Sequence, residues 1–488
     1  MRPIISFACR KLCFLAIVWI LSSTIAYAQE ADVKFTSSDK KMERAFVWAK
    51  GMALHYKGKV GDPVGPWYES ALPPREAFCM RDVSHQSIGA EILGLSKENH
   101  NMFTLFASNI SASKNWCTYW EMNKWAKPAP EDYRNDKEFW YNLTANFDLI
   151  DATWRLYLWT GNKYYINDKA FTNFQEKTVK DYIDSWVLDA DSLLTRPAHP
   201  NAPVPFNEED SFHRCRGLPS YSEGVPNLKT GVDLVAALYR GLLTYSEILA
   251  AKRATKEAAL YAQKAERYRQ RLEADWWDEK DGRYYTYYGN DHKFGKDEGE
   301  TFLLWFDALK NKQRREQTMM HIASKTWNVE NTSYLPYLFY KNGNWDKARD
   351  YILYLADPST ERREYPEVSF GVVEGVIQGL MGVKPNAQSG IVSTIYKTNG
   401  SGNATVTHLS LLNTTINLTH NSKRQSTLYN GGEQQLKWKA MFYGIYKTAK
   451  ANGKSTSVHK ETDEQGKTIS FIVVVVEPGK AVNVKVGD

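Results

Sequence analysis

The chain has 488 residues, with 62 Lys and Arg against 56 Asp and Glu, which gives a net charge of +6. So small an excess excludes the strongly basic surface that nucleic-acid binding requires, and no nucleic-acid partner is predicted. Aromatic residues make up 13% of the chain, with 16 Trp and 29 Tyr. Many lie in polar loops, where amphipathic rings suit the C–H faces of sugars.

The first 28 residues have the pattern of a cleavable secretory signal. Three basic residues precede an apolar run from Leu12 to Leu21, and Ala26-Tyr27-Ala28 supplies the small-x-small cleavage pattern. No later stretch approaches the roughly 20 apolar residues of a membrane span. We therefore expect a soluble mature chain that begins near Gln29, without membrane insertion and located in the periplasm or outside the cell.

Cysteine and histidine are too sparse for a metal or acyl-transfer site. Cys79, Cys117 and Cys215 remain after signal cleavage, an odd number from which one disulfide at most can form. The ten histidines include no His-Glu-x-x-His pair, and the chain lacks a Gly-x-Ser-x-Gly elbow. Asp278 to Gly282 lacks the full ligand set of a calcium loop and is interpreted as a turn. No metal or cofactor is predicted.

The loop from Pro66 to Gln86 gathers aromatic, acidic, basic and imidazole groups just before an apolar-periodic segment. Arg81 and His85 lie four residues apart and share one helix face, with Asp82 beside them. A site for a polar, ring-shaped ligand requires this density of hydrogen-bonding groups, although a charged helix start explains Asp82 equally well. The candidate substrate-binding residues are Trp67, Glu69, Arg81, Asp82, His85, Trp120, Trp140, Tyr221 and Tyr365.

Near-3.6 spacing of apolar residues predicts about a dozen helices before residue 385, with no convincing strand among them. The predicted segments are 39–56, 83–93, 97–111, 143–160, 174–187, 228–250, 256–275, 299–308, 314–326, 345–355 and 370–381. Helices of this kind, paired as hairpins, can close into a ring. We therefore predict a mainly α fold with a helical catalytic domain over residues 29–385.

The character of the sequence changes after Lys384-Pro385-Asn386. Short β-branched runs at 390–395, 405–411, 415–419 and 468–476 alternate with turns rich in Asn and Gly. This pattern predicts a small antiparallel β-sandwich over residues 386–488, acting as an accessory domain that supports the helical body. A separate sugar-binding module is the alternative.

Carboxylates on aromatic loops are the candidate catalytic groups. Hydrolysis of a glycosidic bond needs one protonated carboxyl to assist the leaving oxygen and one ionised carboxylate to activate water or attack carbon. Glu223 lies in a stiff loop that ends at Pro226, which suits a positioned acid. Glu367 and Glu364 flank Tyr365-Pro366 before a helix, and spacing does not separate them. The alternative to a catalytic role for Glu367 is that it caps the N-terminus of that helix.

These segments resemble the six-hairpin glycosidases, the superfamily of trehalases, rhamnosidases and glucuronidase-like enzymes. The resemblance lies in Met80-Arg-Asp82, in Tyr221-Ser-Glu-Gly224 followed by Gly231-Val-Asp-Leu, in the Trp276-to-Tyr285 turn, and in Tyr365-Pro-Glu-Val-Ser-Phe370 with its Gly-rich helix. It extends over most of residues 38–488. The trailing β-domain is similar to the companion sandwich of rhamnosidase-like members.

The resemblance implies an (α/α)6 toroid with a C-terminal β-sandwich, and an O-glycosyl hydrolase that acts on oligo- or polysaccharide with inversion. It also implies Glu223 as general acid, Glu367 or Glu364 as base, and a sugar held by Arg81 with Asp82. The chain departs from the trehalase pattern after Glu223, because Gly-Trp-Asp is absent there. Asp148 and Asp151 are therefore the reserve acids.

Three alternatives stay open at this stage. The first is a uronic acid substrate, because glucuronidase-like members bind a carboxylate with basic groups, and Arg75, Arg81, Arg214 and Arg216 are available. The second is an (α/α)-toroid polysaccharide lyase that cleaves uronate-containing glycans, with His85, His213 or Tyr221 as base. The third is a carbohydrate-binding protein without catalysis.

Overall fold

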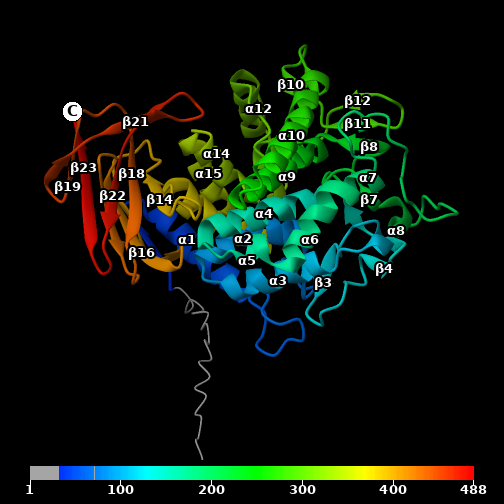
Figure 1. The fold of residues 1–488 in the computed structure, drawn as a ribbon, viewed down its shortest axis with the longest axis horizontal. Coiled ribbons are helices and arrows are strands. Elements are labelled where there is room, and N and C mark those ends of the chain that lie inside the picture. Colours follow the sequence, from blue (N-terminus) through cyan, green and yellow to red (C-terminus); the bar gives the residue numbers. More distant parts are fainter. Residues whose placement is uncertain (1–31, 71) are drawn as a thin grey trace, which may run out of the picture.

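The computed structural model describes residues 32–70 and 72–488, and the predicted signal segment, residues 1–28, lies outside them. The described chain consists of a helical region followed by a C-terminal, mostly antiparallel β-sheet region (Figure 1). The change in sequence pattern near residue 385 therefore coincides with a change in secondary structure.

Helices occupy nearly all the ranges that the apolar spacing predicts. They are α1 Lys40–His55, α2 Met80–Ile92, α3 Ser96–Ser108, α4 Ala145–Thr160, α5 Tyr164–Asn167, α6 Lys169–Lys177, α7 Ile183–Ser185, α8 Ser211–Arg214, α9 Val232–Ala251, α10 Thr255–Asp275, α11 Glu300–Trp305, α12 Lys312–Ser324, α13 Val329–Ser333, α14 Leu335–Lys341, α15 Trp345–Ala356 and α16 Pro366–Glu374, which continues as a π-helical turn, η3, to Leu380. The spacing missed the short helices α5, α8, α13 and α14, of which the last two are separated only by Tyr334.

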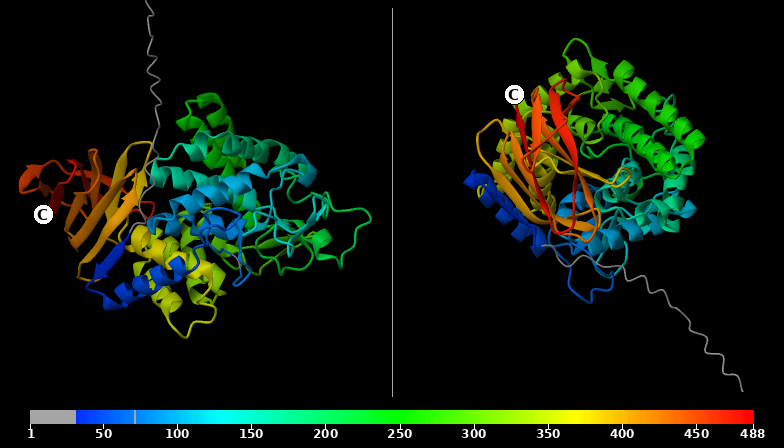
Figure 2. Two further views of the ribbon diagram at one scale, coloured as in Figure 1. Left: turned by 90° about the horizontal axis from the view of Figure 1, so that it is seen from below. Right: turned by 60° about the vertical axis from the view of Figure 1, so that its left-hand side comes forward.

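Six helices contact one another in succession around the helical region: α2 packs on α4, α4 on α9, α9 on α11, α11 on α14, α14 on α16, and α16 on α2. Helices α3, α10, α12 and α15 pack outside this set, on α2, α9, α11 and α14. Figure 2 shows the resulting curved arrangement of helices beside the β-sheet region. Loops at one end of these inner helices are therefore brought close together.

The inner position of α9 follows from its composition. Val232–Ala251 is the one helix of the described residues that is long and apolar enough to cross a membrane by length and composition, which corrects our expectation that no such stretch exists. However, 67% of its apolar window is buried inside the protein. Because a helix that is apolar all round belongs in a core, α9 serves here as a core helix.

Two sheets make up the C-terminal region. The seven-stranded sheet has the order β1-β15-β16-β17-β23-β19-β20, and the five-stranded sheet has the order β13-β14-β18-β22-β21. Their strands are β1 Lys34–Ser37, β13 Lys384–Asn386, β14 Ile391–Ile395, β15 Ala404–Leu411, β16 Thr414–Ser422, β17 Gln425–Asn430, β18 Leu436–Tyr443, β19 Thr448–Ala451, β20 Lys454–Thr456, β21 His459–Thr462, β22 Thr468–Val476 and β23 Ala481–Gly487. All pairs are antiparallel except β14 with β18.

Strand β1 corrects the expectation that no strand precedes residue 385. It pairs antiparallel with β15, so the start of the described chain completes the C-terminal sheet. Further short strands shape the loops of the helical region: β2 Ala77–Cys79, β3 Glu121–Asn123, β4 Tyr133–Asn135, β5 Glu138–Phe139, β6 Tyr141–Asn142, β7 Arg216–Leu218, β8 Leu228–Gly231, β9 Trp277–Asp278, β10 Arg283–Tyr284, β11 Tyr287–Gly289 and β12 Phe294–Gly295. At two to four residues, they are too short to show a period of two.

The two regions are joined by hydrogen bonds and by a continuous core. Trp159 Nε1 of α4 donates to the Ser410 carbonyl at 3.0 Å, and the buried His420 ring lies 3.0 Å from the Met381 carbonyl. The three remaining cysteines are free and buried. Apolar packing rather than a disulfide therefore holds the described chain together.

Candidate functional site

A pocket of about 300 Å³ opens where the loops before α2, α9, α11, α13 and α16 meet. It is lined by Arg81, Asp82, His85, Tyr221, Ser222, Glu223, Gly224, Glu298, Phe302, Asn328, Glu330, Asn331, Ser333, Tyr334, Arg362 and Glu367. Its five carboxyl groups outnumber its two guanidinium groups, so we call it the acidic pocket.

Strand β2 and the first turn of α2 position Arg81 and Asp82. The Met80 amide donates to the Trp120 carbonyl at 2.9 Å, which fixes the start of the helix. Arg81 Nε then donates to Asp82 Oδ1 at 2.9 Å, and the Arg81 guanidinium lies 5.6 Å from the centre of the Tyr221 ring. Both charged groups therefore face the pocket as a fixed pair.

A buried carboxylate, Asp148 of α4, orders the floor of the pocket. His85 Nε2 lies 2.7 Å from Asp148 Oδ2, which also accepts the Tyr221 hydroxyl at 3.2 Å. Trp305 Nε1 donates to Asp148 Oδ1 at 3.1 Å, and the His85 and Trp305 ring centres are 4.3 Å apart. Because Asp148 is fully buried beneath these rings, it orients them rather than lining the pocket.

Asp233, in the first turn of α9, holds the loop that carries Glu223. Asp233 accepts the Tyr221 amide at 2.6 Å and the Ser220 hydroxyl at 2.8 Å. Burial raises the pKa of Asp233 to about 6, against the opposing effect of these hydrogen bonds. A side chain at Gly231 would clash with Asp233 Oδ1 at 2.3 Å. Asp233 of the Gly-Val-Asp-Leu motif therefore holds the Glu223 loop in position through these hydrogen bonds.

The surroundings of Glu223 have opposing effects on its pKa. Burial raises its pKa, while Arg81 and a hydrogen bond from Asn142 lower it. Asn142 Nδ2 donates to Glu223 Oε1 at 3.0 Å, and Asn142 Oδ1 accepts Trp140 Nε1 at 2.9 Å. The carboxyl group is consequently fixed in position, with its pKa above the ordinary value.

Glu367 lies in the first turn of α16, with 7% of its surface exposed. Burial and the neighbouring Asp82 carboxylate raise its pKa to about 8, and Arg81 opposes the shift. The Asp82 carboxylate therefore disfavours ionisation of Glu367, as a neighbouring like charge does. Glu364, the rival of Glu367, is exposed and does not line the pocket.

Sequence reasoning missed the wall of the pocket formed by α11 and α13. Glu298 precedes α11, and burial raises its pKa. Glu330 lies in α13 and faces Arg362 at 3.7 Å. The missed signal was Asn328, whose side chain accepts the Asn331 amide and so begins a helix too short for periodicity.

Several predicted sugar contacts lie outside the acidic pocket. Trp67 is buried and donates to Asp62 at 2.6 Å, and Glu69 accepts the Glu76 amide. Trp120 lies behind Tyr221, with ring centres 6.3 Å apart. Tyr365 and Trp140 do not line this pocket either, although Trp140 lines a neighbouring one.

The reserve acid Asp151 and most of the candidate arginines have other partners. Asp151 accepts Arg240 Nε at 2.6 Å and pairs with Arg155 at 3.2 Å. Arg75 pairs with Glu121 at 2.8 Å. Arg216 is buried and bonds to Asn115 and the Asn201 carbonyl, so only Arg81 of the four candidate uronate ligands reaches the acidic pocket.

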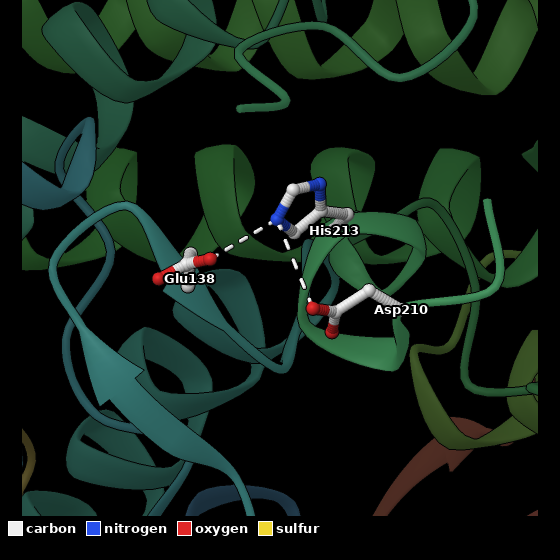
Figure 3. A group of neighbouring side chains, drawn as sticks. All are labelled: Glu138, Asp210 and His213. Atoms are coloured by element: carbon white, nitrogen blue, oxygen red, sulfur yellow. Dashed lines mark hydrogen bonds and ion pairs between the residues drawn. The ribbon is translucent and has the colours of Figure 1, made fainter. Parts of the chain in front are cut away.

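One group of side chains in the described residues has the spacing of metal ligands. Figure 3 shows Glu138, Asp210 and His213, with His213 Nε2 lying 3.1 Å from Glu138 and 3.9 Å from Asp210. Arg134 already pairs with both carboxylates, at 3.0 Å and 2.9 Å. Arg134 therefore already contacts both carboxylates, and His213 lies outside the acidic pocket.

A larger pocket, about 550 Å³, lies between α15 and the β-sheet region. It is lined by Trp345, Tyr396, Tyr443 and Tyr446 among others, and none of its lining residues is Asp or Glu. The acidic pocket is therefore the better candidate for acid–base chemistry, in spite of its smaller volume.

Comparisons with known proteins point to one fold. The Trehalase family model matches residues 222–348. A rhamnosidase of Bacillus sp. GL1 superposes with a TM-score of 0.57 at 13% identity, covering 82% of this chain and 40% of that one. A rhamnosidase of Dictyoglumus thermophilum gives 0.56 at 12% identity, covering 94% and 51%. No match was found among curated proteins.

A glycosidase solved in complex with glucose gives a TM-score of 0.50 at 11% identity, covering 70% of this chain and 98% of that chain. A kojibiose phosphorylase described as putative, from the human microbiome, gives 0.55 at 8% identity. The chain spans about half or less of the length of the two rhamnosidases. At these identities the likeness establishes the fold.

Proposed function

Because the chain has the fold of the six-hairpin glycosidases, we propose that it is an O-glycosyl hydrolase that releases a sugar held in the acidic pocket. The observation that carries this proposal is that Glu223 and Glu367, from loops far apart in the sequence, line one polar pocket with Arg81 and Asp82. A pair of carboxyl groups across a sugar-sized pocket is what glycoside hydrolysis requires.

The ring of six inner helices, with outer helices packed against α2, α9, α11 and α14, supports an (α/α)6 toroid. Residues 29–385 would form this catalytic toroid, and residues 386–488, together with β1, the β-sandwich that supports it. The loops at one end of the toroid then form the pocket. This is the usual arrangement in which a rigid scaffold positions catalytic loops.

We assign Glu223 as general acid and Glu367 as base. Glu223 donates its proton to the glycosidic oxygen as the bond from carbon to that oxygen breaks. Glu367, as carboxylate, takes a proton from the water that attacks the same carbon from the opposite side. Inversion follows from this single displacement. The raised pKa of Glu223 favours its acid role, whereas Glu367 has to lose the proton that burial and Asp82 favour.

The charge of the acidic pocket favours a neutral sugar in it. Its carboxylates exceed its guanidinium groups, and Arg81 and Arg362 each face a carboxylate within the pocket. A uronate would therefore meet repulsion here, while carboxylates accept hydrogen bonds readily from the hydroxyl groups of a neutral sugar. The lyase alternative has less support, because His85 and Tyr221 both direct polar atoms to Asp148.

A screen of 4-nitrophenyl glycosides of neutral sugars, with 4-nitrophenyl uronides as the contrast, tests this proposal. Hydrolysis of one neutral glycoside, with the inverted anomer formed first in NMR spectra, is the expected result. Turnover that persists in both Glu223→Gln and Glu367→Gln would refute the assignment. A new absorbance from an unsaturated uronate would instead establish a lyase.

Export to the periplasm or the medium is part of the proposal and is supported by the signal pattern of residues 1–28. Sequencing the N-terminus of the protein purified from its native source tests it directly. We expect the mature chain to begin near Gln29.

A further inference from the structure

A second pocket, of about 430 Å³, adjoins the acidic pocket. The two share Glu223 and Gly224, so the Glu223 loop is the wall between them. The second pocket is otherwise lined by Trp140, His199, Glu208, the three cations Arg196, Arg214 and Lys229, and neighbouring loop residues. Because its three cations outnumber its two carboxyl groups, Glu208 and Glu223, we call it the basic pocket. A general acid has to contact the oxygen between two sugar units, and Glu223 lies where such a bond would run.

Lys229 of β8 is the first sign of a ligand in the basic pocket. Only 8% of its surface is exposed, yet within the described residues its ammonium group has no hydrogen-bond or ion-pair partner. A lysine that is nine-tenths buried normally pairs with a carboxylate, because burying an unpaired charge is costly. An unpaired ammonium that lines a pocket therefore indicates an anionic ligand.

Two arginines of the basic pocket, like Lys229, lack a carboxylate partner. Arg196 is 2% exposed and donates only to the Lys229 and Trp186 carbonyls, at 3.2 Å and 2.9 Å, while its Nε has no acceptor. Arg214 Nη1 donates to the Glu208 carbonyl at 3.0 Å. No ion pair joins either guanidinium to a carboxylate of the described chain.

We propose that the basic pocket binds the sugar unit on the leaving side of the bond, and that this unit carries a carboxylate, as a uronic acid does. This inference rests on the proposed function. Trp140 offers a ring surface for the sugar, while Lys229 and Arg214 face its carboxylate. The pockets then sort the substrate by charge, with the neutral unit in the acidic pocket and the acidic unit in the basic one.

Binding measurements test this inference without turnover. By isothermal titration or saturation-transfer NMR, wild-type protein is titrated with D-galacturonate, D-glucuronate, D-glucose and inorganic phosphate. We expect a uronate to bind more tightly than glucose and phosphate, and more weakly at high salt. Lys229→Gln and Arg214→Gln should each weaken uronate binding about tenfold or more, since each removes a charged hydrogen-bond donor.

Lys256→Gln is the matched control, because this exposed lysine of α10 lies outside both pockets and should bind uronate as wild type does. Arg214 is exposed, so its variant keeps the test valid if the buried Lys229 variant loses stability, as thermal unfolding would reveal. Uronate binding that is unchanged in Arg214→Gln, or phosphate binding as tight as that of both uronates, overturns the inference.

Failure of the proposed function would look different. Turnover that survives in Glu223→Gln and Glu367→Gln removes the hydrolase assignment but leaves uronate binding to Lys229 and Arg214 in place. The converse outcome is that Glu223→Gln and Glu367→Gln are inactive while wild-type protein does not bind uronate. That outcome removes only the inference about the basic pocket.

Discussion

Asn142 Nδ2 donates a hydrogen bond of 3.0 Å to Glu223 Oε1, and Asn142 is fully buried. Its second Nδ2 hydrogen bond, at 2.8 Å, goes to the Ser220 carbonyl, so one amide fixes both the acid and the loop that carries it. Trp140 orients that amide in turn through its indole N–H. The position of the acid therefore depends on side chains of β6 and its neighbours as well as on α9.

Replacing Asn142 should raise the pKa of Glu223, because a donor to a carboxylate stabilises its ionised form. In Asn142→Ala, the limb of the kcat/KM profile that Glu223 governs should move to higher pH, since the acid stays protonated longer. The overall rate should drop as well, because the carboxyl group is less well held. The pH dependence of kcat/KM measures both effects. A limb that moves to lower pH would contradict the role of Asn142.

Glu223→Gln removes the proton donor, and its effect should depend on the leaving group. For a glycoside with a poor leaving group, we expect kcat/KM to fall by a factor of about 10² to 10⁴. For a 2,4-dinitrophenyl glycoside, whose leaving group needs no protonation, the loss should be much smaller. The comparison requires two substrates with the same sugar. Equal losses on both would assign Glu223 another role.

Glu367→Gln removes the base and should abolish turnover whatever the leaving group, because water activation is needed in every case. Glu364→Gln is the matched control, since Glu364 is exposed and does not line the acidic pocket. Its kcat/KM should stay within about twofold of wild type, as for other surface changes. If the two variants exchange these outcomes, Glu364 is the base.

The pH dependence of activity should depend on Asp82. Glu367 acts only when ionised, and its pKa of about 8 sets one limb of the pH profile of kcat/KM. Asp82→Asn removes the neighbouring negative charge and frees Arg81 to favour the ionised glutamate, and both effects lower the pKa of Glu367. The limb that lies near pH 8 should therefore move to lower pH, even though weaker sugar binding reduces the rate. A limb that stays in place would show that Asp82 does not raise the pKa of Glu367.

The sequence predicted the long helices because their apolar stripes must face a core, and this spacing survives in one chain without alignment. It also predicted Glu223, Glu367, Arg81 and Asp82 as site residues, since charged groups in aromatic loops are poor core material. The wall formed by Glu298 and Glu330 was missed. Its helices, α11 and α13, have six and five residues, too few to show a period.

Two of the aromatic candidates, Trp67 and Trp120, lie outside the acidic pocket for a different physical reason. Trp67 and Trp120 are 5% and 7% exposed, so they pack in the core behind the pocket. A tryptophan in a polar loop can pack in the core or line a pocket, and composition does not distinguish these two positions. The unpaired charge of Lys229 could not be predicted either, because pairing depends on which carboxylates the fold brings near.

Gly371 of α16 tests whether the close packing behind the acidic pocket matters for the site. A methyl group at this position would lie 2.0 Å from the Ser333 carbonyl oxygen of α13, so the two helices would have to separate. We expect Gly371→Ala to lower the free energy of unfolding by about 1–3 kcal/mol, as overpacking does. The rate should fall too, because α16 carries Glu367 and α13 carries Glu330.

Gly51→Ala supplies the control for this change. Gly51 is exposed in α1, with no atom within 4 Å of an added methyl group. Alanine there should raise the free energy of unfolding by about 0.4–1 kcal/mol, because it lowers the entropy of the unfolded chain. Urea unfolding of both variants, beside their kcat/KM values, measures the contrast. If Gly371→Ala proves as stable and active as Gly51→Ala, the contact between α13 and α16 does not position the catalytic carboxylates.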